Sequence, residues 1–248
     1  MTIRVAVAGA TGKMGKLAVR LIEEAPDLEL HAALDSRSAL DGADVALDVT
    51  HPAASGDIVR HAVEARIPVV VGTSGWSADR ITGIRRLHGE VDGAQAVVFV
   101  PNFSVGSVLG TAFAALAARF FDSVEIVEAH HAGKVDSPSG TAVRTAELMA
   151  AARGLEGPVS APHADQRARG QLVGGIPVHS LRLSGVLAEQ RVVLGGDGET
   201  LTISHATLSP SSYEAGILLA LRRAPELEGV TVGLETLLDL GLPSAGEA

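Results

Sequence analysis

Ile3-Arg4-Val5-Ala6-Val7-Ala8-Gly9-Ala10-Thr11-Gly12-Lys13-Met14-Gly15 opens the chain and decides its fold. The nearly continuous apolar run at residues 5–8 is typical of a parallel strand covered on both faces. The following turn has the spacing G-x-x-G-x-x-G, a variant of the dinucleotide-binding fingerprint. Its glycines permit a tight turn and a close approach of the backbone to a pyrophosphate, whose charge a helix N-terminus favours. A tight turn without a ligand is the alternative interpretation.

The surroundings of the turn favour the cofactor interpretation. Asp35 follows the next expected strand, twenty residues past Gly15, where an acid can hold the adenosine ribose hydroxyls. A solvated loop carboxylate is the alternative for Asp35. Because Lys13 and Arg37 are cations that can pair with a 2′-phosphate, we expect the cofactor to be NADH and/or NADPH.

Strand and helix patterns alternate through the first hundred residues. Strands are expected at residues 3–8, 28–34, 44–49, 68–71 and 96–100, and helices at residues 13–25, 53–65 and 77–88. This alternation predicts a parallel sheet with right-handed crossovers. The loops Gly72-Thr73-Ser74-Gly75 and Pro101-Asn102-Phe103-Ser104 follow strand ends, where such sheets bind ligands. Both loops could border a nicotinamide, and plain turns are the alternative.

The pattern changes after residue 104. A helix at 106–121, a strand at 123–130 and a helix at 141–153 precede strands at 178–183, 190–194 and 201–207. The turn Gly195-Gly196-Asp197-Gly198 predicts a hairpin between the last two strands. Residues 154–175, rich in glycine, proline and charge, are expected to form a long mobile loop. A helix at 213–222 and a leucine-rich stretch near 234–240 are expected to pack on the first domain.

These elements predict an α/β chain of two domains. The first is a Rossmann-type dinucleotide-binding domain at residues 1–103, completed by residues 210–248. The second, at residues 104–209, is an α+β domain with an open mixed β-sheet.

Composition excludes several classes of protein. The 248 residues are 46% hydrophobic but only 3% aromatic, contain no cysteine, and carry a formal charge of −9. Few aromatics and a negative charge oppose nucleic-acid binding, and the lack of cysteine removes disulfide and thiolate chemistry. Ser107, Thr111 and Arg119 interrupt the most apolar helix, so no membrane span and a cytoplasmic location are expected.

Glu128-Ala129-His130-His131-Ala132-Gly133-Lys134-Val135-Asp136-Ser137-Pro138-Ser139-Gly140-Thr141-Ala142 carries the chemistry of the chain. The two histidines end a strand with their side chains on opposite faces, and Lys134 follows in a loop. Ser139, Gly140 and Thr141 begin a helix whose amides are available to an anion. Two titratable rings, a cation and these amides suit a small carboxylate-bearing substrate that must be held and protonated.

Each of these residues also has a plain alternative as a structural histidine, a solvated lysine or a capping serine. A metal site is not expected, because adjacent histidines on a strand diverge and no third ligand lies at the required spacing. Asp48 and Asp136 are candidate orienting carboxylates, with a solvated loop position as the alternative.

The quoted turns and the block at residues 128–142, with residues 179–183, 198–205 and 233–235, resemble the dihydrodipicolinate reductase family nearly end to end. The His-His-x-x-Lys and Ser-Gly-Thr elements are highly specific, whereas the glycine turn alone is not. The chain departs from the family pattern at Pro210, where arginine is frequent, and at Ser137, where alanine is more usual.

The resemblance implies NAD(P)H-dependent reduction of 4-hydroxy-tetrahydrodipicolinate to tetrahydrodipicolinate with loss of water, in lysine and diaminopimelate biosynthesis. It also implies a homotetramer assembled through the second domain. His130 then matches a proton donor or acceptor and Lys134 a proton donor, while His131, Ser139, Gly140 and Thr141 bind substrate. The cofactor positions are Gly9, Ala10, Thr11, Gly12, Lys13, Met14, Asp35, Gly72, Thr73, Ser74, Val100, Pro101, Asn102 and Phe103.

Two other functions remain open at this point. One is another two-domain reductase of small oxo or imino acids, such as an aspartate dehydrogenase-like enzyme. The other is a non-catalytic NAD(H)-binding regulatory protein, against which the His130 and Lys134 pair counts.

Overall fold

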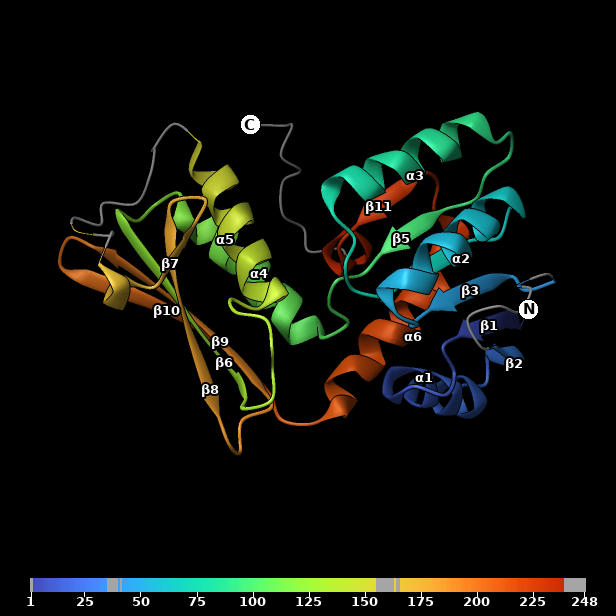
Figure 1. The fold of residues 1–248 in the computed structure, drawn as a ribbon, viewed down its shortest axis with the longest axis horizontal. Helices are drawn as coiled ribbons and strands as arrows, with labels where there is room; N and C mark the ends of the chain where they lie inside the picture. Colours follow the sequence, from blue (N-terminus) through green and yellow to red (C-terminus); the bar gives the residue numbers. More distant parts are fainter. Residues whose placement is uncertain (1, 35–39, 41, 155–162, 164–165, 239–248) are drawn as a thin grey trace. The chain divides into compact units, whose positions relative to one another are not determined.

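The chain folds into two compact units in a computed structural model that describes residues 2–34, 40, 42–154, 163 and 166–238 (Figure 1). The first unit comprises residues 1–103 with 213–248, and the second comprises residues 104–212. No helix within these described ranges is long and apolar enough to cross a membrane.

The first unit contains a six-stranded parallel sheet in the order β11-β5-β4-β3-β1-β2. Its strands are β1 (Ile3–Ala8), β2 (Leu28–Leu34), β3 (Val45–Asp48), β4 (Val69–Val71), β5 (Val97–Phe99) and β11 (Val230–Val232). The strand order switches direction at β1, which pairs with both β2 and β3. Ligands of open α/β sheets bind outside the carboxyl ends of the strands at such a point.

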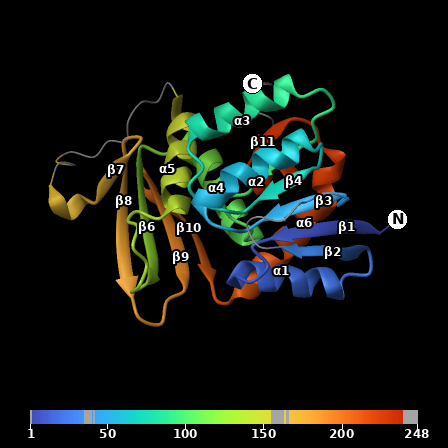
Figure 2. The same ribbon diagram turned by 45° about the vertical axis from the view of Figure 1, so that its right-hand side comes forward.

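Helices cover both faces of this sheet, as Figure 2 shows. One face carries α1 (Lys13–Glu24) and α6 (Glu214–Arg223), and the other carries α2 (Pro52–Glu64) and α3 (Ala78–Glu90). Short 3-10 turns are η3 (Pro210–Tyr213), η4 (Ala224–Glu226) and η5 (Leu234–Leu237). The predicted parallel α/β domain is confirmed, with each expected helix and strand close to its predicted residues. Strand β11, which joins the sheet beside β5, is absent from the sequence predictions.

The second unit contains a five-stranded mixed sheet in the order β10-β9-β6-β8-β7. Its strands are β6 (Ser123–His131), β7 (Gln171–Val173), β8 (Ile176–Leu183), β9 (Ala188–Gly196) and β10 (Glu199–Thr207). Helices α4 (Val105–Ala118) and α5 (Gly140–Arg153) pack on one face of this sheet, over a core that includes Ile126, Met149 and Leu194. The expected mixed sheet and the β9–β10 hairpin are therefore confirmed.

The expectation of one long mobile loop at residues 154–175 is wrong for its second half. The 3-10 turn η2 (Arg167–Arg169) and strand β7 lie there, and β7 pairs with β8 as a hairpin. Val173 faces Ile176 across Gly174 and Gly175, whose φ angles are +57° and +84°. Two consecutive positive φ angles match the twist of paired strands and favour glycine. Residues 155–162, 164 and 165 lie outside the described residues.

Candidate active site

The centre of the site is a buried carboxylate on β6. Alternation along this strand places Val124, Ile126, Glu128 and His130 on the face covered by α4 and α5. The Glu128 side chain is 0% exposed, and its Oε2 lies 2.6 Å from Nδ1 of His130. A buried carboxylate must be paired and hydrogen-bonded, so its other contacts are decisive.

Arg182 of the neighbouring strand supplies the compensating charge. The parallel register of β6 and β8 sets Arg182 opposite His130. The two terminal nitrogens of Arg182 donate to the two oxygens of Glu128, each at 3.0 Å, in the fork geometry of a bidentate pair. The backbone N–H of Ser139 donates to Oε1 of Glu128 at 3.2 Å. Glu128 therefore joins two strands and the start of α5.

The loop from His131 to Ser139 carries Lys134 back to this network. The Lys134 ammonium lies 2.7 Å from Oδ1 of Asp136, and Arg182 donates to the Asp136 carbonyl at 2.5 Å. Ser139 caps α5 by accepting a hydrogen bond from the Ala142 N–H at 3.2 Å. Asp136 is exposed in this loop and also pairs with Lys134, so it has features of both the solvated and the orienting alternative.

Opposing effects act on the two titratable groups at the centre. Burial raises the pKa of Glu128, but hydrogen bonds from Arg182, Ser180 and His130 outweigh it, so the pKa lies below its usual range. Burial lowers the pKa of His130 below the ordinary 6.5, more than the partnership with Glu128 raises it. Lys134 and Arg182 add to the lowering by charge repulsion. The favoured pair is an ionised Glu128 with a neutral His130.

The structure brings the predicted residues His130, Lys134 and Ser139 together around Glu128 and the loop that follows β6. His131 is exposed at the end of β6, one position along the pleat from His130. At Gly140 an added Cβ would meet nothing within 4 Å, so the first turn of α5 is sterically open there. Glu128 and Arg182 are site residues that the sequence predictions did not assign, although a glutamate at an inward position of an apolar alternation was a usable signal.

In the first unit, the glycine turn has the form that a pyrophosphate requires. Gly9 has φ +88°, and a Cβ there would lie 2.6 Å from the Val49 carbonyl oxygen. A Cβ on Gly15 would lie 2.1 Å from the Gly9 carbonyl oxygen, which shows how closely α1 packs on the turn. Gly12 is the N-cap of α1 and provides no side-chain cap. The turn at residues 9–15 thus fits the group that its sequence predicts.

Asp48 ties together the loops that follow the neighbouring strands. Its buried carboxylate accepts hydrogen bonds from the Thr50 N–H at 3.1 Å, from the Thr73 hydroxyl at 3.0 Å and from the Ser55 hydroxyl. Asp48 is therefore an orienting carboxylate rather than a solvated one. It holds the loop after β3 against the loop after β4 at the carboxyl edge of the sheet.

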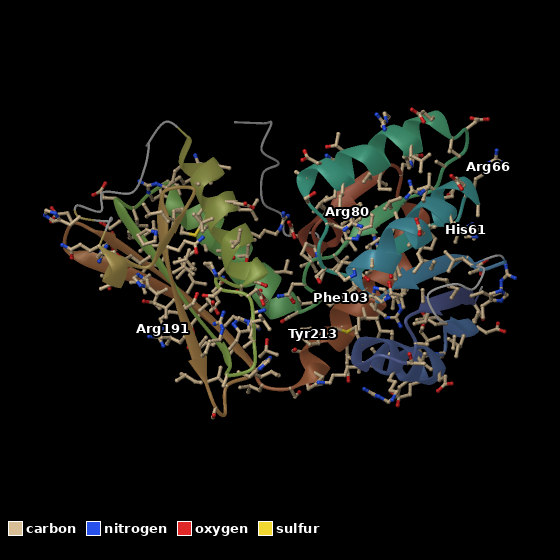
Figure 3. The ribbon with its side chains drawn as sticks, viewed as in Figure 1. His61, Arg66, Arg80, Phe103, Arg191 and Tyr213 are labelled. Carbon is tan, nitrogen blue, oxygen red and sulfur yellow. The ribbon has the colours of Figure 1, made fainter. Side chains whose placement is uncertain are left out.

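The loop after β5 reaches the same edge. Phe103, labelled in Figure 3, is buried, and its ring would lie 2.5 Å from a Cβ on Gly72. Val100 is also buried, whereas Ser74 and Pro101 are exposed. Asp35 and Arg37 lie outside the described residues, so their predicted contacts with the cofactor stay predictions.

A turn of the dinucleotide-binding form in one unit, and the buried Glu128–His130 pair beside Lys134 in the other, fit a nicotinamide-dependent oxidoreductase. The chain belongs to the dihydrodipicolinate reductase family. The family model for the N-terminus of dihydrodipicolinate reductase matches residues 3–103, and the model for its C-terminus matches residues 106–238.

Two curated relatives and one solved structure agree with this assignment. The chain is 62% identical to the 4-hydroxy-tetrahydrodipicolinate reductase of Clavibacter michiganensis subsp. michiganensis, over 97% of this chain and 87% of the relative. It is 47% identical to that of Streptomyces coelicolor, over 96% and 98% of the two chains. A dipicolinate-bound dihydrodipicolinate reductase from Paenisporosarcina sp. TG-14 superposes with a TM-score of 0.82 at 31% identity, covering 96% of this chain and 100% of that one.

Proposed function

We propose that this chain catalyses the NAD(P)H-dependent reduction of 4-hydroxy-tetrahydrodipicolinate to tetrahydrodipicolinate with loss of water. The observation that carries the proposal is the Glu128–His130–Arg182 network beside Lys134, in a chain whose whole length matches the reductase family. The first unit, with its glycine turn, binds the cofactor, and the second unit binds the substrate. The step serves lysine and diaminopimelate biosynthesis.

The bound nicotinamide cofactor would supply the hydride. Hydride addition to a carbon conjugated with an imine leaves negative charge on the substrate ring, which a positioned acid must neutralise. The Lys134 ammonium is that acid, and the neutral ring of His130 accepts or relays a proton. His131 and the first turn of α5 (Ser139, Gly140 and Thr141) hold a substrate carboxylate.

The substrate is a dianion, while the protein carries a formal charge of −9. A local cluster of positive groups must therefore outweigh the global field at the site. His131, Lys134 and the α5 N-terminus lie within one unit and supply that cluster.

The direct assay follows the oxidation of NADH and NADPH with substrate generated by dihydrodipicolinate synthase. We expect turnover with the coupled substrate and none with oxaloacetate plus ammonia, the pair that an aspartate dehydrogenase would use. Turnover with the second pair alone, or dinucleotide binding without any turnover, would replace the proposal with one of the two alternative functions.

The pKa of His130 makes the pH profile of kcat/KM informative. Because burial lowers this pKa, the ring takes up a proton only at a pH below the ordinary value of 6.5. We expect kcat/KM to stay level as the pH falls through 6.5 and to decline only below it. The acid limb should change in His130→Gln. A wild-type midpoint at or above 6.5 would show that His130 does not act as a neutral group.

Cofactor choice is expected to depend on Asp35. Its carboxylate should hold the ribose hydroxyls of NADH and repel the 2′-phosphate of NADPH. Asp35→Ala should therefore raise the NADPH/NADH ratio of kcat/KM, while Lys13 and Arg37 keep NADPH usable. An unchanged or lower ratio would remove Asp35 from the cofactor site.

A homotetramer assembled through the second unit is part of the proposal. The face of the five-stranded sheet opposite α4 and α5 carries half-exposed leucines at Leu172 (47%), Leu181 (45%) and Leu183 (47%). Arg191 of β9, labelled in Figure 3, lies opposite Val127 of β6 in the strand register, and both residues are on this same face of the sheet. Exposed apolar side chains gathered on one sheet face favour burial against another copy. Sedimentation analysis should give a tetramer, and Leu181→Glu should dissociate it.

We propose the cytoplasm, where the nicotinamide pool is available, as the location of the protein.

A further inference from the structure

We propose that Glu128 and Arg182 are positioning residues, which fix His130 as the Nδ1–H tautomer and hold the Lys134 loop in register with it. The catalytic consequence rests on the proposed function, whereas the tautomer does not. Neither residue is a catalytic residue, because each acts through the group beside it.

The hydrogen-bond pattern around Glu128 decides the tautomer. Oε1 accepts from the Ser139 N–H at 3.2 Å and from Arg182 at 3.0 Å. Oε2 accepts from Arg182 at 3.0 Å and lies 2.6 Å from Nδ1 of His130. Since an ionised carboxylate has no hydrogen to give, the proton between these two atoms belongs to Nδ1. The neutral ring then carries its lone pair on Nε2 and can only accept there.

Arg182 connects this carboxylate to the acid. Besides the fork on Glu128, it donates to the Asp136 carbonyl at 2.5 Å and to the Leu181 carbonyl at 2.7 Å. Asp136 in turn holds the Lys134 ammonium at 2.7 Å. One guanidinium therefore sets both the orientation of His130 and the place of Lys134. Lysine could not replace it, because a single ammonium lacks the planar fork.

The charged groups around His130 determine which residue donates a proton and which accepts one. These groups are the acidic Glu128 on β6, the basic Arg182 on β8 and the basic Lys134 in the loop, and Asp136 pairs with Lys134. Burial lowers the pKa of His130, and repulsion by Lys134 and Arg182 adds to this effect, so the ring stays neutral. Lys134 is then the donor of the pair, and His130 the acceptor through Nε2.

The first test reads the tautomer directly in the wild-type protein. Long-range ¹H–¹⁵N spectra at a pH where histidines are neutral distinguish a protonated from an unprotonated ring nitrogen. The chain has nine histidines, so the signals of His130 are assigned by their loss in His130→Gln. We expect a protonated Nδ1 and an unprotonated Nε2, the reverse of the preference of a free histidine. A protonated Nε2, or a mixture of tautomers, would overturn the proposal.

The second test uses Glu128→Gln. Both donors at the Oε1 position, the Ser139 N–H and Arg182, are fixed, whereas at the Oε2 position the His130 ring can present a lone pair at Nδ1 instead of a proton. The amide oxygen should therefore take the Oε1 place, and the amide NH₂ should face Nδ1 of His130. This arrangement imposes the Nε2–H tautomer. The comparable asparagine substitution in serine proteases lowers kcat by about 10⁴-fold, so we expect a loss of about 10²–10⁴-fold with KM much less affected. Glu128→Asp, which keeps a carboxylate, should restore the Nδ1–H signal and part of the lost kcat.

A matched control removes a carboxylate from another bidentate arginine pair. Asp27 accepts from Arg222 at 2.8 and 2.9 Å in the first unit, and Asp27→Asn should leave both kcat and the His130 spectrum unchanged. Loss of kcat in Glu128→Gln with an unchanged tautomer would contradict the positioning role. If the wild type shows no turnover, the proposed function fails, while the wild-type spectrum still decides the tautomer.

Discussion

Lys134→Ala is expected to lower kcat by about 10²–10⁴-fold, the usual cost of losing one positioned proton-transfer group. Its dissociation constant for NADH should stay close to that of the wild type. The reason is that Lys134 belongs to the second unit, where Asp136 holds its ammonium at 2.7 Å, and the glycine turn belongs to the first. The measurement is steady-state kcat beside NADH binding by fluorescence titration.

Arg86→Ala is the control for charge. It removes one cation from the same acidic chain at an exposed position on α3, so kcat should not change. Lys134→Arg should recover less than the full rate, because a guanidinium keeps the charge but gives up a proton far less readily. Near-normal turnover in Lys134→Ala would show that another group is the acid.

Gly15→Ala is expected to have the second large effect, on cofactor binding and on stability. The new Cβ would lie 2.1 Å from the Gly9 carbonyl oxygen and 2.7 Å from the Ala10 Cα, and both are backbone atoms that cannot rotate away. The turn or the start of α1 must shift. Overpacking of this kind costs about 1–3 kcal/mol, and a displaced turn should raise the Kd for NADH by at least about tenfold, which corresponds to about 1.4 kcal/mol.

Gly83→Ala is the matched control, because a Cβ at this position of α3 meets nothing within 4 Å. Alanine there should leave NADH affinity unchanged and slightly raise the free energy of unfolding, since alanine favours a helix over glycine. The measurements are chemical denaturation and NADH titration of both variants. Wild-type affinity in Gly15→Ala would mean that the turn does not bind the pyrophosphate.

The sequence predicts the first unit well because its signals are local. The glycine turn, the apolar strands and the amphipathic helices each occupy one short segment, and parallel βαβ order follows from their alternation. Strands β7 and β11 are missed because each has only three residues and includes a polar one, whereas the equally short β4 and β5 are continuous buried apolar runs. The Gly174-Gly175 pair is typical of a hairpin turn between two strands. Because it lies in a segment rich in glycine, proline and charge, the whole segment is predicted to be a loop.

The site is only partly predictable for a different reason. His130 and Lys134 lie in one segment, so their spacing predicts a shared task. Arg182 is 54 residues from Glu128, and only the register of β6 with β8 makes them partners. No sequence period encodes a pairing across a crossover connection. The ion pair that orients His130 therefore becomes visible only in the folded chain.

The most direct test of the central claim follows the hydride itself. Wild-type protein is incubated with cofactor deuterated at nicotinamide C4 and with substrate from dihydrodipicolinate synthase, and the product is analysed by mass spectrometry. We predict tetrahydrodipicolinate carrying one deuterium, from one of the two C4 faces only, in amounts equal to the cofactor oxidised. Oxidised cofactor without deuterium in tetrahydrodipicolinate, or no oxidation with this substrate, would contradict the assignment of this chain as its reductase.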